Sequence, residues 1–331
     1  MSSLYVTEQG AMLRKSGERL IVSAKEQPLL ERHFRDIRRV LIFGNIQVST
    51  QVITEFLRHG IDVSYFSTFG TFRGKLVGAT SKNIYSRLAQ ITRYQDKQFL
   101  LSLAKTTVSK KLEAQIKILK KRRFGVKQAD PVLQEAVKLI SQSLAEISNA
   151  QSNALLRGLE GSAARAYFSS FDVLLPSEFP FEKRTRRPAL NPMNSALNFS
   201  YTLLLNEVNN VLESYGFDVM LGFFHSVRYG RVSLALDAME IFRPLLVDQW
   251  LLQIIRQKKI QYKHFYFNEK KGVYFTDEGR KIFLQLFQQW HTTMHYRDLI
   301  EKLVKSLEIA YLEGEVEHYA NATEEILLGL L

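Results

Sequence analysis

The order of apolar and polar residues along the chain changes character near residue 78. Before that point, short β-prone runs at residues 4–6, 11–14, 20–22 and 40–43 are separated by glycine-containing or charged stretches, which is typical of strands and hairpin turns. A helix is predicted to begin after Ser49 or Thr50, which can cap it, and to end near residue 58, before Gly60. A strand follows over residues 61–66. The pattern predicts a small strand-rich domain with one short helix.

Beyond residue 78, glycine is sparse and apolar residues recur at helical spacing. Helical stretches are predicted over residues 81–121, 131–171, 195–215, 233–258, 277–289 and 293–313. Four prolines between residues 176 and 192 mark an irregular segment. The predicted fold class is therefore α+β, with a β-rich N-terminal domain over residues 1–78 and a larger all-α domain over residues 79–331.

Positive charge is abundant and clustered. Lys and Arg total 45 against 33 Asp and Glu, so the formal net charge is +12. Basic residues concentrate at positions 101–130 and 183–187, where repulsion disfavours such clustering unless an anion is the neighbour. Phosphate groups of a nucleic acid fit this pattern. A solvated helix face is the alternative for any single cluster. The candidate phosphate-binding residues are Lys117, Lys120, Lys121, Arg122, Arg123, Arg184, Arg186 and Arg187.

The chain has no cysteine, which excludes disulfides, cysteine nucleophiles and thiolate metal sites. Its first residues lack the basic and apolar regions of a signal peptide, and its apolar runs are too short to span a bilayer. A protein of the reducing cytoplasm, with no membrane partner, is expected.

Candidate chemistry lies at three carboxylates, those of Glu160, Asp237 and Glu240, and at His225. Glu160 is flanked by Gly158 and Gly161, and glycine inside a helix costs roughly 0.5–1 kcal/mol relative to alanine. Either close helix packing or room for a ligand at Glu160 explains the two glycines. His225 ends an apolar run before a glycine-containing break, which suits a pocket residue, but for a lone histidine a partly buried residue bonded to backbone is the favoured explanation.

Asp237 and Glu240 are three residues apart in an apolar helical stretch, so both carboxylates are expected on one side of the helix. Burying them requires a cation, which a metal ion or Arg243 can supply. An exposed acidic edge is the alternative.

Three segments together resemble a known family. These are LEGSAARAYF at residues 159–168, GFFH at 222–225 and SLALDAMEIFRP at 233–244, and their order and spacing resemble motifs of the CRISPR adaptation integrase, the universal CRISPR-associated endonuclease. RRP at 186–188, followed by NPMNSALNFSY at 191–201, resembles a further family segment. The family usually has Asp where this chain has Asn191, which puts a charge-based role for that position in doubt. The resemblance covers most of the chain.

The resemblance implies a β-rich N-terminal domain used for dimerisation and a helical catalytic domain. It also implies a divalent metal held by Glu160, His225 and Glu240, with Asp237 as a further ligand or a supporting group. Carboxylates suit Mg²⁺ and Mn²⁺, and an imidazole favours Mn²⁺.

The function implied by the resemblance is spacer integration. A short double-stranded DNA fragment uses its 3′-hydroxyl to attack a phosphodiester of the CRISPR repeat array, with nuclease activity as a side reaction. A homodimer and a small second CRISPR adaptation protein are the implied partners. Two alternatives remain: a DNA-binding scaffold of the same fold without chemistry, and a metal-dependent RNA-processing nuclease.

Overall fold

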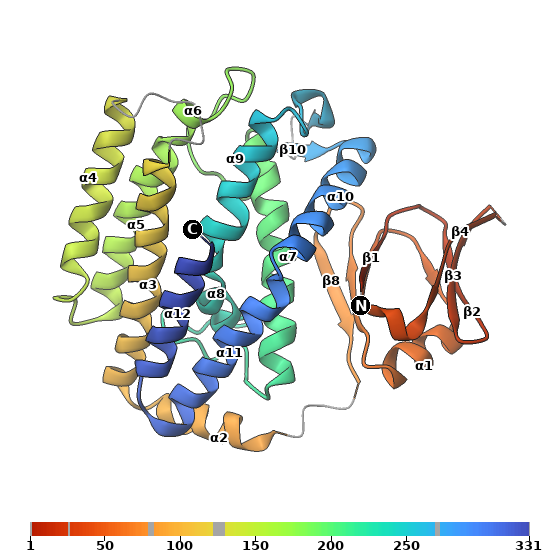
Figure 1. Cartoon of the computed structure of the whole chain (residues 1–331), viewed down its shortest axis with the longest axis horizontal. Helices are drawn as coiled ribbons and strands as arrows, with labels where there is room; N and C mark the ends of the chain where they lie inside the picture. Colours follow the sequence, from red (N-terminus) through yellow and green to blue (C-terminus); the bar gives the residue numbers. More distant parts are fainter. Residues whose placement is uncertain (1, 26, 79–82, 122–129, 269–271, 331) are drawn as a thin grey trace. The chain divides into compact units, whose positions relative to one another are not determined.

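The computed structural model describes residues 2–25, 27–78, 83–121, 130–268 and 272–330 (Figure 1). The chain forms two compact units: residues 1–80 with 280–290, and residues 81–279 with 291–331. The sequence-based division assigned residues 280–290 to the helical domain, and the structure groups them with the first unit. Side-chain contacts explain this grouping. Arg280 donates to the Thr68 carbonyl at 2.6 Å, and Gln288 donates to the Ser3 carbonyl at 2.8 Å.

The described residues of the first unit form two four-stranded sheets, the helix α1, a short 3-10 helix (Phe34–Asp36) and part of α10 (Asp277–Thr293) (Figure 1). One sheet has the order β1-β5-β7-β8 and the other β4-β3-β2-β6. The elements are β1 (Ser2–Val6), β2 (Met12–Ser16), β3 (Arg19–Ala24), β4 (Gln27–His33), β5 (Ile37–Phe43), β6 (Gln47–Val48), α1 (Thr50–Arg58), β7 (Asp62–Phe66) and β8 (Phe72–Leu76).

Local signals explain most of these elements. Ser49 caps α1 by accepting a hydrogen bond from the Val52 N–H, and Gly60 follows the helix with a φ of +62°. Apolar residues of β2, β3, β5, β7 and α1 form one buried core. Strands β4 and β8 were not predicted, because many of their side chains are exposed and carry no clear alternation of buried and exposed positions.

The second unit is almost entirely helical. Its elements are α2 (Ile84–Arg93), α3 (Lys97–Lys120), α4 (Pro131–Glu146), α5 (Asn153–Ser169), α6 (Phe171–Leu174), α7 (Pro192–Ser214), α8 (Ser233–Met239), a π-helical segment (Arg243–Asp248), α9 (Gln249–Arg256), α11 (Tyr296–Glu313) and α12 (Glu317–Leu330). A hairpin of β9 (Phe265–Asn268) and β10 (Gly272–Phe275) is added to them, and α10 (Asp277–Thr293) runs through residues 280–290 of the first unit. The expected α+β fold class is confirmed.

Helix α3 is central to the second unit, where it packs against α4, α5, α12 and the π-helical segment (Figure 1). The continuous helix expected over residues 233–258 is wrong, because α8 ends at Met239 and the π-helical segment precedes α9. Pro244 lies in this segment and has no N–H to donate to a preceding carbonyl. The β9–β10 hairpin and α12 were also not predicted.

Asn191 has a structural role at the start of α7. Its side chain accepts a hydrogen bond from the Asn194 N–H at 2.8 Å, and Pro192 occupies the first position of the helix. A helix cap needs an oxygen acceptor, and an amide supplies one as well as a carboxylate does. The departure of Asn191 from the family pattern therefore leaves this local structure intact.

Candidate metal centre

Asp237 fixes the loop that carries His225. It lies on α8 with its side chain fully buried, and its carboxylate accepts hydrogen bonds from three consecutive backbone N–H groups. The donors are Phe223 at 2.7 Å, Phe224 at 2.9 Å and His225 at 2.9 Å. Burial raises the pKa of Asp237, and its bonds to His225 and to the backbone oppose this. An exposed acidic edge on α8 is therefore wrong.

Gly222 allows this close approach. A Cβ atom at residue 222 would lie 2.5 Å from the Asp237 Oδ2 and 2.9 Å from the Ser233 carbonyl carbon. By contrast, a Cβ at residue 158 meets nothing within 4 Å, and one at residue 161 meets only the end of Arg165 at 4.0 Å. Close helix packing therefore does not explain Gly158 and Gly161.

This contrast gives a stability prediction. Gly222→Ala is expected to reduce the free energy of unfolding by about 1–3 kcal/mol, since the methyl group overpacks a buried site. Gly158→Ala is the matched control and is expected to raise it by roughly 0.5–1 kcal/mol, because alanine is the better helix former. Urea denaturation followed by circular dichroism measures both changes, and a Gly222→Ala protein at least as stable as the wild type contradicts the prediction.

His225 is held in a defined orientation. Its Nδ1 lies 2.5 Å from the Asp237 Oδ1, and its side chain is 19% exposed. A ring that donates its Nδ1–H to a carboxylate carries its lone pair on Nε2, which is the usual arrangement of a metal-binding histidine. The alternative of a histidine bonded only to backbone is wrong, because the Asp237 carboxylate contacts the ring.

Glu160 and Glu240 share one lysine. The Lys111 Nζ on α3 forms ion pairs with Glu160 on α5 and, at 2.6 Å, with Glu240 at the end of α8. Arg243 contacts Glu240 from the other side at 2.7 Å. Burial by itself would raise the pKa of Glu240, but Arg243 and Lys111 lower it to about 2. Both Lys111 and Arg243 therefore supply the positive charge that a buried Glu240 requires.

The chemistry of these groups fits a divalent metal ion. One imidazole nitrogen and two carboxylates form a mixed donor set of the kind that binds Mn²⁺ or Mg²⁺. The Lys111 ammonium already bridges the two carboxylates as a cation. The spacing is not that of a closed ligand set, however. Among the described residues, only Glu18, Glu55 and His59 bring one ligand atom each to within 4.8 Å of one another.

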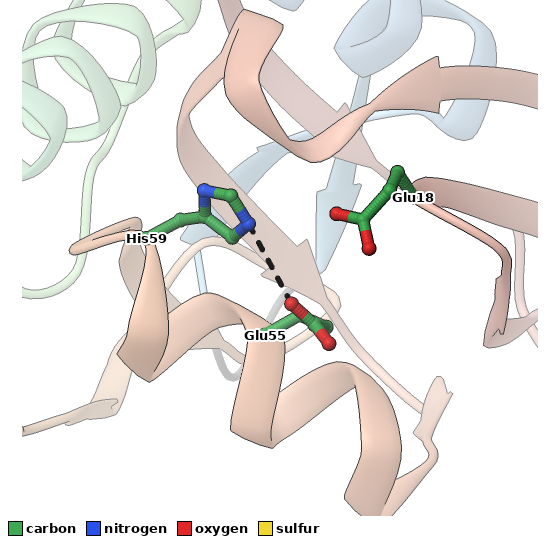
Figure 2. A group of neighbouring side chains, drawn as sticks. All are labelled: Glu18, Glu55 and His59. Atoms are coloured by element: carbon green, nitrogen blue, oxygen red, sulfur yellow. Dashed lines mark ion pairs between the residues drawn. The ribbon is translucent and has the colours of Figure 1, made fainter.

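Figure 2 shows this second group, in which Glu55 and His59 come from α1 and its C-terminal end and Glu18 from the turn between β2 and β3. Its carboxylates already have cationic partners. Glu55 pairs with Lys15 and, at 2.6 Å, with Arg58, and Arg58 also lies 3.1 Å from Glu18. The hydrogen bond from Lys15 lowers the pKa of Glu55 most, and the contacts with Arg58 lower it further. These contacts explain the cluster as an ion-pair network of the first unit. Sequence reasoning missed it because Glu18 reaches α1 only through the fold.

The predicted phosphate-binding residues divide into two groups. Arg184 is engaged within the fold, because it donates to Asn194 at 3.0 Å and to Asn198 at 2.7 Å, and its guanidinium lies over the Tyr201 ring. Burial lowers the pKa of Arg184 to about 10. Lys120, Arg186 and Arg187 are exposed, Lys117 is half-buried, and Lys121 donates to Gln249 at 3.2 Å. Arg122 and Arg123 lie outside the described residues.

The structure adds a basic group that sequence reasoning missed. The loop after His225 exposes Arg228 and Tyr229 and leads to Arg231. Burial lowers the pKa of Arg231, and the positive charges of Arg228, Arg186 and Arg157 lower it further. Arg157 lies on α5, three residues before Glu160. That spacing was the sequence signal that could have pointed to Arg157.

A buried network lies behind Arg243. Tyr201 on α7 donates to the Asp248 carboxylate at 2.5 Å, and the Arg243 guanidinium lies 4.9 Å from the centre of the Tyr201 ring. Burial raises the pKa of Asp248 to about 7. Arg243 is thus held between Glu240 and Tyr201.

Within the described residues, no helix is both long enough and apolar enough to cross a membrane.

Comparison with known proteins places this arrangement in a family. The sequence profile described as "CRISPR associated protein Cas1" matches residues 4–289. A CRISPR-associated endonuclease Cas1 of Thermus thermophilus is 36% identical over 264 residues, which cover 79% of this chain and 76% of the relative.

Two solved structures have the same fold. A chain of a Cas6-RT-Cas1–Cas2 complex has a TM-score of 0.82 at 22% identity, over 96% of this chain and 36% of that longer chain. A casposase bound to integration product has a TM-score of 0.81 at 22% identity, over 95% of this chain and 92% of that one. The match over residues 4–289 and the identity to the Thermus endonuclease lead to one conclusion: this chain belongs to the Cas1 family of CRISPR-associated endonucleases.

Proposed function

We propose that this chain is a metal-dependent DNA integrase that inserts short DNA fragments into a CRISPR repeat array. One observation carries the proposal: the His225 Nδ1 contacts the Asp237 carboxylate, which leaves Nε2 as the ring nitrogen that can bind a metal, and His225 also acts on Glu240, which Lys111 bridges to Glu160. In the proposed holoenzyme, Glu160, His225 and Glu240 hold one Mn²⁺ or Mg²⁺ ion, and Asp237 is a positioning residue because its oxygens are used by the loop.

The reaction proposed is a transesterification. The 3′-oxygen of the fragment forms a bond to a phosphorus atom of the repeat, the bond from that phosphorus to its own 3′-oxygen breaks, and one proton passes from the attacking to the leaving hydroxyl. When bound, a divalent ion offsets the negative charge of the pentavalent transition state. Asp237 keeps the His225 ring oriented, and Arg243 keeps Glu240 ionised, so both ligands are ready to bind. Attack by water in place of the hydroxyl gives endonuclease activity.

Support for DNA as substrate comes from the basic residues beside the site and from the family. The casposase of similar fold was solved with an integration product, and the Cas1 chain of similar fold was solved in a complex with Cas2. We propose that this chain likewise binds double-stranded DNA, forms a homodimer through residues 1–78, and assembles with the small second CRISPR adaptation protein.

An integration assay tests the proposal. The purified full chain is incubated with a labelled short DNA duplex and a supercoiled plasmid that carries the repeat, with Mn²⁺ or Mg²⁺, and with or without the second adaptation protein. Label covalently joined to the plasmid, dependent on metal and on a free 3′-hydroxyl, is the expected result. Labelled product from a fragment with a blocked 3′-end contradicts the proposed chemistry.

The basic group near His225 gives a binding prediction. Arg228→Ala is expected to weaken DNA binding and to reduce the slope of log K against log salt concentration by about 0.9 for each phosphate that Arg228 neutralises. Lys138→Ala is the control, since Lys138 is exposed on α4 and pairs with Glu135. Fluorescence anisotropy across salt concentrations measures the slope, and a matched RNA duplex that binds as tightly as the DNA favours the RNA-processing alternative.

The scaffold alternative also has an observation in its favour. Lys111 and Arg243 balance the charge of Glu160 and Glu240 without a metal ion, so these residues satisfy one another as a purely structural cluster would. DNA binding without strand transfer in either metal, by a folded wild-type protein supplied with its partner, is the result that would select the scaffold.

A further inference from the structure

Lys111 lies in the centre of the proposed metal site, although it is not one of the ligands. Its side chain is 7% exposed, and its ammonium group contacts both Glu160 and Glu240. A buried lysine is stable only when its charge is paired. Lys111 therefore occupies the position between two carboxylates that a bound cation would also occupy.

The local charges balance without a metal ion. Glu160 and Glu240 carry two negative charges, and Lys111 and Arg243 carry two positive charges. A divalent cation added to these residues would leave an excess of positive charge, even when the buried Asp237 carboxylate beside His225 is counted. Such an excess in a buried site is unfavourable unless a cation leaves or an anion enters.

Of the two cations, Lys111 is the one that can move. Arg243 is held by the ion pair to Glu240 and by its stacking on the Tyr201 ring. Lys111 is a compact charge on a flexible four-carbon stem, and rotation about that stem moves its Nζ without moving α3. The contacts that hold the Nζ in place are those to the two proposed ligands.

We propose that Lys111 is an exchangeable counter-cation, which leaves Glu160 and Glu240 when a divalent ion binds and pairs instead with a phosphate of the bound DNA. This inference rests on the proposed metal site. It adds Lys111 as a positioning residue and a coupling between the binding of the divalent ion and the binding of DNA. Metal binding releases Lys111 to the DNA, and DNA binding draws Lys111 away from the carboxylates. Thermodynamic linkage requires that the divalent ion and the DNA each strengthen the binding of the other by the same factor.

The test compares Lys111→Met with the wild type and with Lys110→Met. Lys110 is the neighbouring lysine on α3, and it pairs with Glu113 and Glu324 outside the site, which makes it a matched control. Mn²⁺ affinity is measured by isothermal titration calorimetry on the full chain without DNA. Affinity for a labelled DNA duplex is measured by anisotropy, once with Mn²⁺ and once with chelator at equal ionic strength.

For the wild type and Lys110→Met, we expect Mn²⁺ to strengthen DNA binding by about tenfold. For Lys111→Met, we expect Mn²⁺ to bind the free protein about tenfold more tightly, because no ammonium has to be displaced, and the effect of Mn²⁺ on DNA affinity to be lost. A purely structural role for Lys111 predicts the opposite sign, a weaker Mn²⁺ affinity. Circular dichroism establishes that each variant is folded.

If Lys111→Met does not fold, Lys111→Arg replaces it. Arginine keeps the charge and can bind both carboxylates at once, so it should compete more strongly with Mn²⁺ and weaken its binding. Unchanged Mn²⁺ affinity in the folded variant, or no Mn²⁺ binding to the wild type, overturns the inference. These measurements do not depend on strand transfer. A wild type that shows the coupling but joins no DNA disproves the proposed function and leaves the role of Lys111 standing.

Discussion

Glu160→Gln is expected to reduce metal-dependent strand transfer by on the order of a thousandfold and to leave DNA binding almost unchanged. The amide has nearly the same shape as the carboxylate but lacks the negative charge that holds a divalent ion. Its side chain lies in the middle of α5 and is about one-fifth exposed, and Glu240 remains to pair with the buried Lys111, so the variant is expected to fold. Rates of joining of a labelled duplex in Mn²⁺, with DNA affinities from anisotropy, measure the two effects separately.

Two further variants sharpen this result. His225→Ala should have a similar effect, because the imidazole is the one nitrogen ligand of the proposed set. Glu135→Gln on α4 should have none, since Glu135 is exposed and pairs with the equally exposed Lys138. Strand transfer at the wild-type rate in a folded Glu160→Gln protein would remove Glu160 from the site.

Asp237→Ala is expected to have the largest effect on stability. It leaves the buried N–H groups of Phe223, Phe224 and His225 without their acceptor, and each unsatisfied buried donor costs roughly 1–3 kcal/mol. A decrease of about 3 kcal/mol or more in the free energy of unfolding follows. Mn²⁺ affinity should also fall by roughly 10–100-fold, because the His225 ring is no longer oriented.

Asp218→Ala is the matched control for this prediction. The Asp218 side chain accepts a hydrogen bond from the Met220 N–H at 2.9 Å, and it is exposed in the same connection between α7 and α8. Its replacement should cost no more than about 1 kcal/mol. Urea denaturation measures both variants, and equal stability of Asp237→Ala and Asp218→Ala would show that the Asp237 carboxylate does not support the loop.

Local sequence signals were sufficient where a few neighbouring residues determine the structure. Ser49 and Gly60 marked the two ends of α1, and the apolar run at residues 40–43 marked the buried part of β5. They were insufficient where the partners are distant or the segment is mostly exposed. Strand β4 has no fully buried side chain, and its position depends on pairing with β3. The grouping of residues 280–290 with the first unit depends on contacts with residues more than two hundred positions away.

The same distinction applies to the candidate site. Family motifs identified Glu160, His225, Asp237 and Glu240, but only the fold shows that Asp237 serves the loop and that Glu240 faces two cations. The basic cluster at residues 101–130 suggested phosphate contacts throughout. In the structure, Lys105 donates to the Ser148 carbonyl, and Lys110 and Lys111 form ion pairs with glutamates of other helices. Charge clustering alone cannot distinguish lysines that bind DNA from lysines that neutralise buried acids, because the acids are remote in sequence.

The most direct test of the central claim is anomalous diffraction from crystals of the full chain soaked in Mn²⁺. The account predicts an anomalous peak coordinated by Glu160, the His225 Nε2 and Glu240, with the Lys111 side chain turned away from both carboxylates. A peak found only among Glu18, Glu55 and His59, or no peak while Lys111 still bridges Glu160 and Glu240, would contradict it.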